Sequence, residues 1–60
     1  MTTDQLDELY SGLCATLSKI GEADAALFLG RFALLAMVRL GDADLARQLI
    51  DEAAAGLPGH

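Results

Sequence analysis

The sequence has little of what small proteins use to stabilise a fold. In 60 residues it contains one cysteine, Cys14, one proline and no tryptophan. A single cysteine cannot form a disulfide within the chain, and there is no cluster of cysteine and histidine residues to bind zinc. A chain of this length also buries a core of marginal size. We therefore expect association, with a second copy or with another protein, to complete the fold.

Histidine and basic residues are also few. The only histidine, His60, stands at the end of the sequence, so Cys14 has no internal base; we expect no catalytic residues, no metal ligands and no cofactor. Four basic residues face nine acidic ones, which gives a formal net charge of −5. Such a chain repels phosphate backbones and anionic lipids, so neither nucleic acid nor a membrane is an expected partner.

Long uncharged runs are missing as well. Asp24, Arg31 and Arg39 divide the most apolar region into runs much shorter than the roughly 20 residues that cross a bilayer. The first eight residues are polar and acidic, unlike the basic start and apolar run of a secretory signal. We expect a cytoplasmic protein, with Cys14 as a reduced, buried and inert thiol among leucines.

Hydrophobic residues, in contrast, make up 53% of the chain, and their spacing predicts an all-α fold. We expect one helical domain over residues 1–60, a three-helix hairpin-type bundle with helices at about 4–20, 22–40 and 42–55 and a tail at 56–60. The first and third helices are amphipathic, with apolar residues at steps of three and four. Gly12, inside the first helix, marks either a close helix contact or a weak point.

The joints between helices repeat after twenty positions, as Lys19-Ile20-Gly21-Glu22-Ala23-Asp24 and Arg39-Leu40-Gly41-Asp42-Ala43-Asp44. In each, a basic residue falls in a last helical turn, a glycine provides a left-handed exit, and acids follow at the next N-terminus. This pattern predicts a matched pair of helix ends, with no functional role for the acids.

The second helix is apolar nearly all round, so two neighbouring helices cannot cover it. Its most polar side still carries Phe28 and Leu35 between Asp24, Arg31 and Arg39. The two arginines either pair with a carboxylate while their stems cover apolar surface, or meet a partner together with Phe28 and Leu35. Small residues at Ala26 and Gly30 would let another helix approach closely. The candidate interface residues are Phe28, Arg31, Leu35, Arg39, Ala26 and Gly30.

The run GRFALLAMVRLGD at 30–42, with Leu9-Tyr10 before it and Leu45 and Leu49 after it, resembles a family of very short bacterial helical proteins of unknown function. Arg31, Gly41 and Asp42 match that family's pattern. Its members are often encoded beside flavin-dependent aromatic hydroxylases, which implies an accessory subunit of an oxidoreductase in aromatic catabolism. Two functions are therefore expected: a non-enzymatic interaction protein that forms a homodimer through its central helix, or a small subunit of a larger enzyme.

Overall fold

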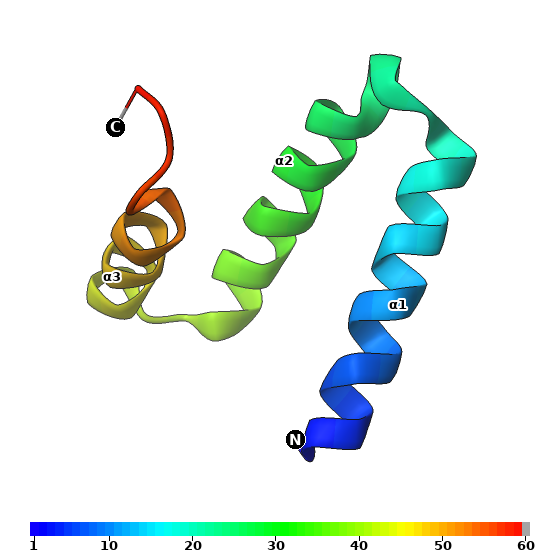
Figure 1. Cartoon of the computed structure of the whole chain (residues 1–60). Coiled ribbons are helices and arrows are strands. Elements are labelled where there is room, and N and C mark those ends of the chain that lie inside the picture. The colour runs from blue at the N-terminus through cyan, green and yellow to red at the C-terminus, as the bar shows by residue number, and fades with distance from the viewer. Residues whose placement is uncertain (60) are drawn as a thin grey trace.

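The computed structural model describes residues 1–59 and consists of three α-helices joined by short turns (Figure 1). α1 spans Thr3–Ile20, α2 spans Glu22–Leu40 and α3 spans Ala43–Ala54. The expected all-α fold with three helices is confirmed, and each helix begins and ends within one residue of its expected position. Of the expected tail at 56–60, residues 56–59 follow α3 as turns and a bend, and His60 lies outside the described residues.

α1 begins with a capping box. The backbone N–H of Gln5 donates to Thr2 Oγ1 at 3.1 Å, and the backbone N–H of Thr2 donates to Gln5 Oε1 at 2.9 Å. The two side chains thus satisfy backbone groups that have no partner within the helix. Asp4 adds a negative charge to the first turn and Lys19 a positive charge to the last, which complements the helix dipole at both ends.

The two joints end one helix and begin the next by different geometries. Gly41 adopts the left-handed conformation, with φ 71° and ψ 16°, and its N–H donates to the carbonyl oxygen of Met37. Gly21 has a positive φ of 88° but an extended ψ of 165°, and no side chain caps the start of α2. The repeated sequence motif therefore correctly marks both turns, whereas the expected left-handed exit holds for Gly41 alone.

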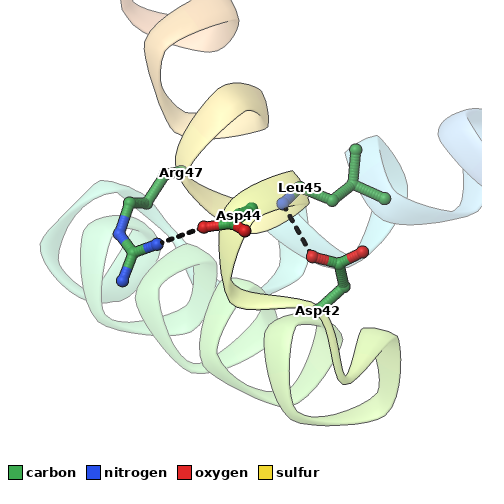
Figure 2. A network of polar contacts seen from close by, with 4 residues as sticks. All are labelled: Asp42, Asp44, Leu45 and Arg47. Carbon is green, nitrogen blue, oxygen red and sulfur yellow. Dashed lines mark hydrogen bonds and ion pairs between the residues drawn. The ribbon is translucent and has the colours of Figure 1, made fainter.

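α3 begins with a side-chain cap (Figure 2). Asp42 Oδ1 accepts a hydrogen bond from the backbone N–H of Leu45 at 3.0 Å. From the same first turn, Asp44 Oδ1 accepts a hydrogen bond from Arg47 Nη1 at 2.8 Å, and both side chains are largely exposed. An exposed pair of this kind contributes little to stability, so the cap at Asp42 is the stronger determinant of where α3 begins.

The three helices do not close around a core. α1 and α2 are joined at the Gly21 turn and α3 leaves the other end of α2 (Figure 1), and neighbouring helices contact each other only near these joints. Within residues 1–59, no two residues twelve or more positions apart bring their Cα atoms within 8 Å. The radius of gyration is 13.1 Å, whereas a compact chain of this length has a value of about 10 Å.

The open arrangement leaves every described side chain at least partly accessible to solvent. No residue from 1 to 59 is buried, and partial burial is confined to nine positions, most of them beside the two joints. These are Leu13, Leu17, Ile20, Gly21, Ala25, Phe28, Met37, Ala46 and Ala54. Residues 1–59 therefore form no core of their own, in spite of the high hydrophobic content of the chain.

None of the three helices combines the length and the apolar character needed to cross a membrane, as judged over residues 1–59.

Candidate interaction surface

The candidate residues from the sequence all lie on α2, and the structure divides them between two sides of that helix. At about 100° per residue, Phe28, Arg31, Leu35 and Arg39 fall within about 80° of the helix circumference. Asp24 falls within the same range, near the N-terminal end of α2. We call these five residues, Asp24, Phe28, Arg31, Leu35 and Arg39, the charged stripe.

Most of the charged stripe is exposed to solvent. Leu35 is 59% exposed, and Asp24, Arg31 and Arg39 are exposed as well. Phe28 is half-buried because it lies near the Gly21 joint, where Ile20 of α1 comes close; Ile20, Phe28 and Arg31 are among the residues that line a shallow hollow of about 290 Å³ there. α1 diverges from α2 beyond this point, so the part of the stripe around Leu35 stays open.

Ala26 and Gly30 lie on the opposite side of α2. Both are exposed, and a Cβ atom added at Gly30 would meet no atom within 4 Å. No helix of the same chain therefore approaches α2 at these small residues. The proposed interface residues thus form two separate surfaces, the charged stripe and a small-residue side.

The arginines of the stripe are not paired with any carboxylate in the part of the chain that the structure describes. Among residues 1–59 the only ion pair joins Arg47 to Asp44, on α3. Asp24 borders the same hollow as Arg31 without pairing with it. Of the two interpretations of the arginines, pairing with a carboxylate is not found among residues 1–59, and both arginines are exposed.

α2 also exposes a second apolar side, whose centre lies about 80° around the helix from the centre of the charged stripe. Leu27, Leu34 and Val38 lie here with exposed fractions of 55%, 60% and 69%. Neither α1 nor α3 covers them. The sequence predicts that α2 is apolar on sides that its two neighbours cannot reach. The exposure of these three residues agrees with that prediction.

An apolar groove between α2 and α3 was not among the expected sites. It has a volume of about 350 Å³ and is lined by Ala33, Ala36, Met37, Leu40, Ala46, Leu49, Ile50 and Ala53. The sequence carried a signal for it, because both helices place apolar residues at steps of three and four on either side of the Gly41 joint. What the sequence did not reveal is that the groove stays open in the single chain.

The expectation of a buried Cys14 is wrong for the single chain, because the thiol is exposed. Cys14 lies at the edge of the apolar stripe of α1, whose partial cover by α2 is limited to Leu13, Leu17 and Ile20. A neighbouring helix would have to follow α1 along its length to bury the thiol, and α2 diverges instead.

The structure brings no set of three or more histidine, cysteine or carboxylate side chains within residues 1–59 into an arrangement that could hold a metal ion. Comparison of the chain with known protein families, curated proteins and solved structures finds no match. What this surface can do is therefore inferred from its own chemistry. Exposed leucines flanked by unpaired arginines and a carboxylate are suited to binding another protein.

Proposed function

We propose that this chain is a non-enzymatic helical interaction protein that forms a homodimer through α2. In this proposal the three-helix bundle expected from the sequence is completed between two chains, since one chain leaves α2 uncovered on several sides. A helix that is apolar nearly all round is stable in water when its sides are covered by other helices. A second copy supplies a helix for at least one of these sides.

The area exposed by the single chain carries the proposal. A folded monomer of this size exposes about 3,700 Å², whereas this chain exposes 5259 Å². The excess of about 1,500 Å² per chain amounts to about 3,000 Å² for two chains, which lies within the roughly 2,000–5,000 Å² buried by obligate homodimers. The excess therefore has the size that a stable dimer requires.

A second candidate is a small non-catalytic subunit of a larger enzyme, the function implied by the resemblance to short bacterial proteins encoded beside flavin-dependent aromatic hydroxylases. The observation that favours it is the presence of more than one open apolar surface on α2. Pairing of two copies through the charged stripe leaves Leu27, Leu34 and Val38 on another side of the helix, where a larger chain could bind.

Sedimentation equilibrium at micromolar concentration tests the homodimer. We expect the wild-type chain to be a dimer and the Leu35→Glu variant to dissociate at least about tenfold more readily, because burial of a leucine is lost and a charge enters the interface. Leu9→Glu on α1 is the matched control, since Leu9 and Leu35 are both 59% exposed. We expect it to weaken the dimer less.

A wild-type chain that is a well-folded monomer at these concentrations would exclude the homodimer. Equal dissociation of the Leu35→Glu and Leu9→Glu variants would show that α2 is not the principal contact. The accessory-subunit function predicts instead a poorly folded isolated chain that co-purifies with a much larger protein from the native host, and recovery of the chain without such a protein would contradict it.

A further inference from the structure

The charged stripe of α2 is nearly symmetric about its own centre. Asp24 and Arg39 are equally far from a point between Arg31 and Phe32, and Phe28 and Leu35 are equally far from the same point. Each half of the stripe thus has a charged residue outside and a large apolar residue inside. The two outer charges have opposite signs.

A stripe with this symmetry is complementary in charge to a second copy of itself when the two copies are antiparallel. In a two-fold symmetric dimer, if one residue contacts another across the interface, the reverse contact is also present. When two copies of α2 are antiparallel, Asp24 of each lies beside Arg39 of the other, and Phe28 of each lies beside Leu35 of the other. Parallel copies would bring Asp24 against Asp24 and Arg39 against Arg39, which is unfavourable.

The helix dipoles also favour the antiparallel orientation. Glu22 and Asp24 lie in the first turn of α2 and Arg39 lies in the last turn. An antiparallel pair places the positive end of each helix next to the negative end of the other, together with side chains of complementary charge. The parallel pair aligns like ends.

We infer that two copies of this chain pair α2 against α2 in antiparallel orientation, about a two-fold axis that passes between Arg31 and Phe32. This rests on the proposed self-association and specifies its geometry. Leu35 of each chain, 59% exposed in the single chain, is covered by the half-buried Phe28 of the other. Arg31 of each chain lies near the axis at the edge of the stripe, next to Arg31 of the other chain; its stem covers the apolar centre and its guanidinium reaches solvent, which screens the two like charges.

Charge reversal at the ends of the stripe tests the orientation. Asp24→Arg and Arg39→Asp each convert both symmetric contacts from attractive to repulsive, and we expect each to weaken the dimer about tenfold at low ionic strength. The double variant restores both contacts with the signs exchanged, so its dissociation constant should return to within about threefold of wild type. In a parallel dimer, the single variants would leave the like-charged pairs like-charged.

The ion pair of α3 provides the matched control. Asp44→Arg and Arg47→Asp produce the same changes in net charge, and Asp44, like Asp24, lies in the first turn of a helix. We expect these two variants to leave the dissociation constant within about threefold of wild type. Weakening equal to that of the Asp24 and Arg39 variants would show an effect of net charge alone and overturn the antiparallel contact.

Cross-linking gives a readout that does not depend on the strength of the charges. In a Cys14→Ser background, chains carrying Asp24→Cys and chains carrying Arg39→Cys are mixed and treated with a short bis-maleimide. We expect covalent dimers in the mixture and none with Asp24→Cys alone, because antiparallel pairing holds the two copies of residue 24 about 22 Å apart along the helix. Cross-linking of Asp24→Cys with itself would establish the parallel dimer.

The two measurements separate the antiparallel geometry from self-association itself. A wild-type dimer whose Asp24 and Arg39 variants behave like the α3 controls overturns the antiparallel geometry and leaves self-association in place. A wild-type monomer in sedimentation equilibrium overturns self-association itself, and the antiparallel pair with it.

Discussion

Gly41 and Asp42, adjacent in the sequence, end one helix and begin the next. Gly41 takes a positive φ that residues with a Cβ atom rarely adopt, and its N–H donates to the carbonyl oxygen of Met37 at 3.1 Å. Asp42 then accepts a hydrogen bond from the N–H of Leu45. Both interactions are local, so these two residues determine the joint without help from tertiary packing.

The cap at Asp42 can be tested by two substitutions. We expect Asp42→Ala to lower the free energy of unfolding by about 1 kcal/mol, because an N–H at the start of α3 loses its acceptor. Asp42→Asn should retain most of the stability, since an amide oxygen can also accept the bond. Urea denaturation measures both. Equal destabilisation by Ala and Asn would contradict a role for the hydrogen bond.

At the scale of the helices, α1 and α3 differ from α2 in how their apolar residues are distributed. α1 and α3 each have one apolar side and one polar side, whereas α2 has exposed apolar residues on several sides. α2, the most apolar of the three, lies between the other two helices (Figure 1). Its neighbours nevertheless diverge from it, and its exposed leucines are left for a partner chain.

Gly12 of α1 allows a test at this scale. A Cβ atom added at Gly12 would meet no atom within 4 Å, so the single chain provides no close contact there. We expect Gly12→Ala to raise the free energy of unfolding by up to about 1 kcal/mol through helix propensity. Gly21→Ala, at a φ of 88°, should destabilise the chain instead.

The measurements are thermal or urea unfolding followed by circular dichroism, together with the dimer dissociation constant. If Gly12→Ala weakens the dimer, Gly12 is a point of close approach between chains, as one interpretation of the sequence holds. An unchanged dissociation constant with higher stability would identify Gly12 as a weak point of α1.

At the scale of the whole molecule, the chain exposes 5259 Å² and has no buried residue within 1–59. Small domains are marginally stable even when they bury about 60% of the surface of the unfolded chain. An isolated copy with no core therefore has little to balance the loss of conformational entropy on folding. In the proposed dimer, folding and association are a single process.

Thermal unfolding should then depend on protein concentration. For a dimer of this size that unfolds to separate chains, we expect the midpoint to rise by about 5 °C for each tenfold increase in concentration. The Leu35→Glu variant should show a lower midpoint at every concentration. Circular dichroism melts over a hundredfold range would measure the effect, and a midpoint that does not move with concentration would indicate that a single chain folds alone.

Helical geometry alone predicts both the charged stripe and its separation from the small residues of α2, whereas the open surroundings of the stripe could not be predicted from the sequence. The steps from Phe28 to Arg31, Leu35 and Arg39 place these residues together on any straight helix. Ala26 and Gly30 are small residues that favour close approach of a helix, yet the same helical geometry places them on the opposite side. The expected burial of Cys14 is wrong, because hydrophobic neighbours along α1 do not establish that another helix covers them.

The sequence by itself determined the three helices and their limits, because caps and helix-ending glycines act through bonds between residues three or four positions apart. Thr2 with Gln5, Gly41 with Met37 and Asp42 with Leu45 are all of this kind. The tertiary structure decided that the helices stay open, that Leu35 and Cys14 face solvent, and that a groove remains between α2 and α3. These features depend on the angles at two short joints. The apolar pattern of a helix shows which of its sides is suited to burial, but not which helix or which chain buries it.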